Sequence, residues 1–91
     1  MEKPSKKEPT EKELEKLGVK TWGIWEKEPS KFDWYYDSTE TFYVLEGEAD
    51  VETKAGDKIS FKEGDMVTFP QGIDCTWNIK RKIRKHYKFE D

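Results

Sequence analysis

From Thr21 onward the sequence alternates apolar and polar residues in short stretches, and Gly, Pro, Asp or Ser separates each stretch from the next. The stretches recur at a spacing of about 8 to 12 residues, which is typical of strands in a β-sandwich or barrel. We therefore expect an all-β, antiparallel fold. The predicted strands span residues 21–26, 31–36, 41–53, 57–62, 66–69, 74–80 and 83–90.

The segment before these strands predicts one short helix. Thr10 and Glu13 have the spacing of a capping box, in which each residue bonds to the backbone of the other. Gly18 stands where a helix would end in the left-handed conformation. The sequence therefore predicts a helix over residues 11–17, with its leucines on the buried side.

The chain length of 91 residues allows one domain, which we place at residues 10–91. Residues 1–9 are polar and contain two prolines, so they are predicted to form a flexible N-terminal arm. This arm lacks the apolar middle of a signal peptide, and no apolar run reaches the roughly 18 residues of a membrane span. We expect a cytoplasmic chain with no membrane partner.

Charged residues make up 41% of the chain, and the net charge of −3 gives no overall reason to bind nucleic acid. A surface rich in Lys and Glu is typical of heat-adapted or deliberately idealised proteins. It predicts a thermostable domain without separating these two origins. Cys75 is the only cysteine, so no internal disulfide can form, and a reducing compartment fits the sequence best.

One basic stretch, KRKIRKHYK at residues 80–88, stands apart from this balance. Basic side chains with an interleaved aromatic can bind a phosphate backbone. The alternation spreads these charges over two faces, however, and the many acidic residues elsewhere would repel a polyanion. We interpret the stretch as a solvated hairpin and expect no nucleic-acid partner.

Alternation also assigns side chains to the inner or outer face, because neighbouring residues of a strand point in opposite directions. In residues 32–36, 75–79 and 83–89 we interpret the mostly apolar face as the inner one. This assignment carries Lys85 inward and turns His86 outward. The aromatic, aliphatic and thiol side chains assigned inward are Phe32, Trp34, Tyr36, Cys75, Trp77, Ile79, Ile83, Tyr87 and Phe89.

Four stretches carry a resemblance to a known family. ETFYVLEG at residues 40–47 resembles the end of the first cupin motif, and GDMVTFPQGIDCTW at residues 64–77 resembles the second. An FxWxY stretch at residues 32–36 and KHY at residues 85–87 are similar to the small single-domain cupins of the ureidoglycine aminohydrolase-like, RmlC-like group. The resemblance implies an antiparallel jelly-roll barrel, which follows the one short helix predicted above.

Metal-dependent cupins hold one divalent metal with two histidines and a glutamate from the first motif and a histidine from the second. At these positions the chain has Trp34, Tyr36, Glu40 and Cys75. The resemblance therefore implies a degenerate metal site, and we expect no cofactor. An alternative keeps a divalent metal on Glu40, Cys75 and His86, which is a legitimate ligand number for catalytic zinc.

The candidate pocket contains one acid, Glu40. If burial among indoles raises its pKa, Glu40 becomes a candidate catalytic acid or base near neutral pH. If Lys85 reaches Glu40, the pair is structural instead. A lysine in an apolar pocket could also form a Schiff base with a carbonyl compound. The predicted pocket residues are Trp34, Tyr36, Glu40, Cys75, Trp77 and Lys85.

These residues predict a small-molecule-binding cupin with an aromatic pocket around one acid. Two alternatives stay open. The first is a metal-dependent or acid/base enzyme acting on a small nitrogenous or carbonyl metabolite, and the second is a stable scaffold or interaction module without a ligand. The exposed strand edges of such a barrel favour pairing into a homodimer.

Overall fold

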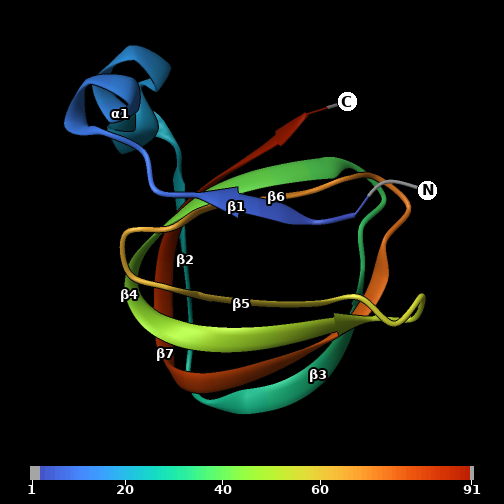
Figure 1. Cartoon of the computed structure of the whole chain (residues 1–91). Coiled ribbons are helices and arrows are strands. Elements are labelled where there is room, and N and C mark those ends of the chain that lie inside the picture. Colours follow the sequence, from blue (N-terminus) through green and yellow to red (C-terminus); the bar gives the residue numbers. More distant parts are fainter. Residues whose placement is uncertain (1–2, 91) are drawn as a thin grey trace.

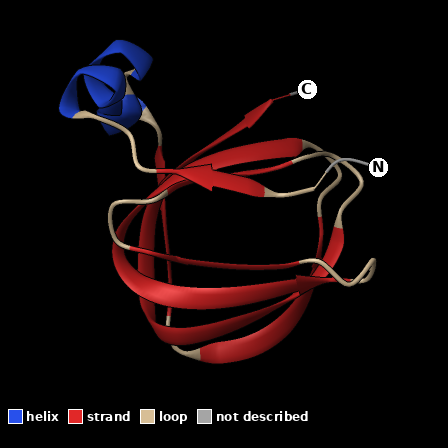
Figure 2. Ribbon diagram, viewed as in Figure 1, coloured by secondary structure: helices blue, strands red, loops and turns tan. Residues whose placement is uncertain are grey.

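The structure, a computed structural model, describes residues 3–90. Strands predominate in this range, with one short α-helix and one 3-10 turn (Figure 2). This confirms the predicted all-β class with a short N-terminal helix. The elements are β1 (Ser5–Lys7), α1 (Glu11–Leu17), η1 (Val19–Thr21), β2 (Gly23–Lys27), β3 (Ser30–Tyr35), β4 (Thr39–Thr53), β5 (Lys58–Lys62), β6 (Met66–Phe69) and β7 (Asp74–Glu90).

The strands form one antiparallel sheet that curls around the core (Figure 1). The strand order is β1-β6-β4-β7-β2, with β3 pairing with β7 and β5 pairing with β4. β4 and β7 are 15 and 17 residues long and pair with each other along most of their length. These two long strands position most of the site described below.

β7 is one continuous strand where the sequence predicted two strands with a break near residues 81–82. Its pairing with β4 shifts register between Val44 and Ala49, so the sheet bends there without ending. Gly47 permits the bend, because its φ is 99° and a Cβ at this position would collide with the carbonyl oxygen of Lys82. The predicted hairpin within residues 80–88 is therefore wrong.

The helix α1 has the predicted bounds and caps. The Thr10 side chain accepts a hydrogen bond from the Glu13 backbone N–H, and Gly18 ends the helix at a φ of 67°. Leu17, expected on a buried side, is 48% exposed, because α1 lies beyond one end of the sheet (Figure 1). Within residues 3–90 no helix is long and apolar enough to cross a membrane.

The predicted flexible arm is wrong for residues 5–7, which form β1 on the edge of β6. Ser5 pairs with Thr68 and Lys7 with Met66. Polar side chains do not prevent this pairing, because it uses the backbone groups that the edge of β6 leaves free. The rest of this prediction includes residues 1–2, which lie outside the described part of the chain.

An aromatic cluster around Trp77 fills the core. Aromatic pairs of this kind contribute about 0.5–1.5 kcal/mol each beyond the area they bury. Phe32 and Trp25 belong to the cluster and, together with Trp77, also line the pocket described below. The ring centroids nearest to Trp77 are those of Phe61 at 5.3 Å, Phe42 at 5.8 Å, Phe32 at 5.9 Å, Trp25 at 6.0 Å and Phe69 at 6.1 Å.

Candidate ligand pocket

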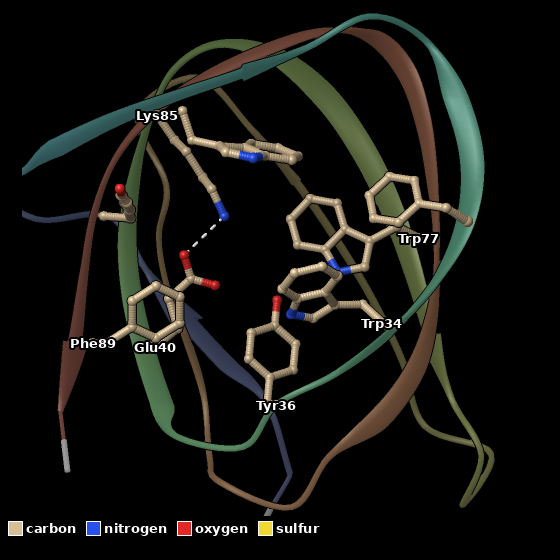
Figure 3. Close-up of a pocket in the computed structure, with 9 residues that line it drawn as sticks. Trp34, Tyr36, Glu40, Trp77, Lys85 and Phe89 are labelled. Atoms are coloured by element: carbon tan, nitrogen blue, oxygen red, sulfur yellow. Dashed lines mark hydrogen bonds and ion pairs between the residues drawn. The ribbon is translucent and has the colours of Figure 1, made fainter.

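A pocket of about 190 Å³ opens between β2, β3, β4 and β7. Its lining is largely aromatic and includes two ionisable side chains of opposite charge, Glu40 and Lys85. Figure 3 shows these two side chains pointing toward each other across the space that the aromatic rings surround. The aromatic lining residues are Trp25, Phe32, Trp34, Tyr36, Trp77, Tyr87 and Phe89.

β4 carries Glu40 on its buried face. Both faces of residues 41–45 are apolar, so alternation did not fix the orientation of this strand. In the structure Glu40, Phe42 and Val44 are buried, whereas Thr41 and Tyr43 are half-buried. Only 4% of Glu40 is exposed, so its carboxylate needs a partner inside the protein.

That partner is Lys85. Its Nζ donates a hydrogen bond of 3.0 Å to Oε2 of Glu40, and both side chains are nearly inaccessible to solvent. The register of β4 with β7 places Lys85 opposite Val44, on the same face as Glu40. The long lysine side chain runs along the sheet to reach the carboxylate. The predicted inward orientation of Lys85 is therefore confirmed.

The Lys85 ammonium lies among aromatic rings. Its Nζ is 3.9 Å from the ring centroid of Phe42, 4.7 Å from that of Trp25 and 4.9 Å from that of Trp77. These rings favour the charged form through cation–π attraction. Burial opposes this and lowers the pKa of Lys85, although Glu40 acts in the other direction. The balance leaves Lys85 easier to deprotonate than an exposed lysine.

Tyr36 adds a neutral donor beside the pair. Burial and then the charge of Glu40 raise the pKa of Tyr36 far above its ordinary value, so the phenol stays protonated. Its ring stacks on Phe69 with the centroids 4.7 Å apart, and Figure 3 shows the hydroxyl directed into the pocket. Trp77 is also a potential donor, because its buried Nε1 has no hydrogen-bond partner within residues 3–90.

The pocket has unused hydrogen-bonding capacity. An ammonium carries three donors, and the described residues supply Lys85 with one side-chain acceptor, Glu40. The pocket can therefore receive a polar group that accepts from Lys85 or Tyr36 and donates to Glu40. The aromatic walls suit an apolar body attached to that group.

Cys75, predicted in the pocket, does not line it. The residue is fully buried, and its Sγ donates a hydrogen bond of 3.5 Å to the carbonyl oxygen of Trp34. Burial, followed by the charges of Asp74 and Asp33, raises the pKa of the thiol to about 11. A thiol that stays protonated is a poor nucleophile and a poor metal ligand.

The alternative metal site on Glu40, Cys75 and His86 does not form. His86 lies opposite Ile24 and Tyr43 and is absent from the pocket lining, as its predicted outward orientation requires. Within residues 3–90 no group of three His, Cys, Asp or Glu side chains is placed to hold a metal ion. The divalent metal that the resemblance implies therefore does not fit these residues, because the Glu40 carboxylate already bonds to Lys85.

The structure brings together Trp34, Tyr36, Glu40, Trp77 and Lys85, five of the predicted pocket residues. The sequence did not predict the other four lining residues as part of the pocket. A signal for three of them existed, because alternation places Tyr87 and Phe89 on the same face of β7 as Lys85, and Phe32 on the same face as Trp34. For the residue from β2, the signal appears only in the register, which pairs it with Lys85. The missed residues are Trp25, Phe32, Tyr87 and Phe89.

The sequence matches the family described as the EutQ-like cupin domain over residues 14–87. A DUF861 family protein from Thermotoga maritima is 46% identical, has a TM-score of 0.95, and the match covers 97% of this chain and 100% of that chain. The EutQ protein of Clostridium difficile is 27% identical with a TM-score of 0.67, over 74% of this chain and 52% of that chain. A putative ethanolamine utilization protein Q from Salmonella typhimurium gives 27% identity and a TM-score of 0.66, over 74% of this chain and 54% of that chain. No curated protein matches the chain.

Proposed function

This chain belongs to the EutQ-like cupin domain family, and on that premise we propose that it binds a small molecule in the pocket around Glu40 and Lys85. We infer that its curled sheet is a jelly-roll barrel like that of other cupins. The observation that carries the proposal is the buried ion pair, which borders an aromatic pocket of about 190 Å³.

The energetics of this pair argue against an inert scaffold. Burying two charges costs several kcal/mol per ion, and the attraction between them often only offsets that cost. Hydrophobic residues of similar volume often stabilise a protein about as well as a buried ion pair. A pair kept next to an open pocket has a use beyond stability, and recognition of a polar ligand group is the use that its free donors and acceptors support.

The lining defines the chemical class of the ligand. The proposed ligand has a compact polar head, such as a hydroxyl, carbonyl or carboxyl group, that bonds to Lys85, Glu40 and Tyr36. Its body is flat or apolar and packs on the indole and phenyl rings. The Lys85 ammonium already lies among the rings of Trp25, Phe42 and Trp77, so a cationic ligand would meet a like charge there. Recognition proceeds without a resident metal, because three of the four ligand positions carry Trp34, Tyr36 and Cys75.

Binding can be measured by tryptophan fluorescence and thermal shift with benzyl alcohol, benzoate and benzaldehyde as probes. Trp34 lines the pocket and is 48% exposed, so Trp34→Ala removes a pocket wall at little cost to folding. We expect it to weaken binding about threefold to tenfold, the value of one aromatic contact. Tyr35→Ala is the matched control, because Tyr35 is the next residue, is 58% exposed and does not line the pocket.

The control variant should bind the probes as the wild type does. Saturable binding that Trp34→Ala weakens and Tyr35→Ala leaves unchanged supports the proposal. It fails if no probe gives a saturable response, or if both substitutions change binding equally.

A further inference from the structure

We propose, building on the function proposed above, that Lys85 is a nucleophilic amine that forms a Schiff base with a small aldehyde or ketone bound in the pocket. The inference rests on the position of Nζ, which lines the cavity, is shielded from bulk water and has one carboxylate as its charge partner.

The position of Nζ is unlike that of the other lysines for which the structure shows an ion pair. The lysines of the remaining ion pairs keep 46% or more of their side chains exposed, whereas Lys85 keeps 4%. The centroids of aromatic rings from β2, β4 and β7 lie 3.9 to 4.9 Å from Nζ. Figure 3 shows Nζ directed into the space that the rings surround, so a carbonyl carbon bound in this pocket can approach the amine.

The reactive form of lysine is the neutral amine, and the surroundings of Lys85 favour it. Burial lowers the pKa of this group, as in lysines that act as nucleophiles in apolar pockets. The 3.0 Å hydrogen bond to Glu40 gives the proton a place to go. Transfer along this bond converts the ammonium and carboxylate into an amine and a carboxylic acid, and the pair stays neutral overall.

Condensation of the Lys85 amine with the carbonyl group releases water as the sole by-product. The Nζ lone pair attacks the carbonyl carbon and forms the C–N bond, while the carbonyl π electrons move to oxygen, which takes the proton held by Glu40. The nitrogen of the resulting carbinolamine returns one proton to Glu40. Glu40 passes this proton to the hydroxyl, which leaves as water as the nitrogen lone pair forms the C=N bond. The product is a protonated Schiff base paired with the Glu40 carboxylate.

Other groups of the pocket suit this reaction. The Tyr36 phenol is protonated, and the Trp77 Nε1 is a buried donor without a partner within residues 3–90, so both can donate to the carbonyl oxygen as it gains charge. The aromatic walls limit access of water to the imine. A purely structural pair would need neither an open cavity beside the amine nor unpaired donors around it.

The test traps the imine with borohydride. The folded wild-type protein is incubated at neutral pH with a limiting amount of benzaldehyde and then with sodium borohydride, which reduces the imine to a stable secondary amine. Peptides from a protease that does not cleave at lysine are mapped by mass spectrometry. We expect Lys85 to carry more label than any exposed lysine, because its lowered pKa leaves more of the amine neutral and the pocket holds the aldehyde beside it. The preference should shrink as the pH approaches the ordinary lysine range.

Two variants provide controls. Lys58→Met removes an exposed lysine on β5 and should leave the labelling of Lys85 unchanged. Lys85→Arg keeps a cation but lacks a reactive amine, so the dominant labelled peptide should disappear. Because the wild-type peptide map by itself locates the label, the test does not depend on whether Lys85→Arg folds.

Benzyl alcohol, which lacks the carbonyl, separates this inference from the proposed function. Saturable binding of benzyl alcohol with label spread over exposed lysines and none at Lys85 overturns the Schiff base and leaves the binding function standing. If no probe binds and Lys85 is unlabelled, the binding function itself fails. Selective label at Lys85 supports both.

Discussion

Within residues 3–90, two ion pairs join a lysine of β7 to a carboxylate of β4, and they have the same Nζ–O distance but differ in burial. Glu40 and Lys85 lie 3.0 Å apart with 5% and 4% of their side chains exposed. Asp50 and Lys80, farther along the same two strands, also lie 3.0 Å apart, with 40% and 52% exposed. The Nζ–O distance alone would make the two pairs equivalent.

The lysine pKa shifts show that the pairs are not equivalent. The hydrogen bond and charge of Asp50 raise the pKa of Lys80, as expected of an exposed pair. Burial lowers the pKa of Lys85 despite Glu40. In the first pair solvent keeps both ions hydrated, and in the second the protein has removed that hydration. Burial, and not the distance between the ions, makes Lys85 of the inner pair, Glu40 and Lys85, easier to deprotonate than Lys80 of the outer pair, Asp50 and Lys80.

The largest expected effect comes from breaking the inner pair. Lys85→Met leaves Glu40 buried without its partner, and this should lower the free energy of unfolding by about 3–5 kcal/mol. In a domain of this size the loss corresponds to roughly 12 °C or more in Tm. Urea unfolding and thermal melts measure it. A loss no larger than that of Lys80→Met would show that the two pairs are equivalent after all.

Replacing both members of the inner pair should cost much less. Glu40→Leu combined with Lys85→Met fills the same space with apolar atoms and leaves no charge unpaired, so we expect a loss under about 2 kcal/mol. A double-mutant cycle with the two single variants measures the coupling between them. Additive single-variant losses would contradict the ion pair as the source of the effect.

The stability of the protein should depend on pH through Lys85. Because the folded-state pKa of Lys85 is lowered, the unfolded chain binds more protons between that pKa and the ordinary lysine value. Lys85 should therefore make the free energy of unfolding rise with pH across this window, by at most about 1.4 kcal/mol per pH unit. Urea unfolding of wild type and Lys85→Met from neutral pH to about pH 10 isolates this contribution. Parallel profiles for the two proteins would refute it.

The outer pair should give the smallest effect. Asp50→Asn removes a carboxylate whose pKa is lowered by hydrogen bonds from Ser60 and Lys80, and which solvent largely screens. We expect a change in Tm close to the replicate scatter, and it should vanish when salt is added. The lowered pKa also means that this contribution is lost as the pH falls through the acid range. A salt-independent loss comparable to that of Lys85→Met would erase the contrast between the pairs.

Much of the fold could be predicted because its causes are local. The caps of α1 lie within a few residues of the helix, and alternation along each strand is enough to assign Trp34, Trp77 and Lys85 to the pocket side. Local patterns failed where a distant strand decided the outcome. β7 continues through a predicted break because it pairs with β4, and residues 5–7 are ordered because β6 offers an open edge.

The sequence by itself determined the all-β class, the short helix, the inward face of β7 and the loss of the histidines that hold the metal in other cupins. The first three follow from residue type and period, and the last follows from the resemblance to the cupin motifs. Only the tertiary structure decided that Glu40 meets a lysine 45 residues away, that Cys75 stays out of the pocket, and that the pair lies beside a cavity. Those outcomes depend on strand register and on how far each side chain reaches, because both are set by contacts between segments that are remote along the chain.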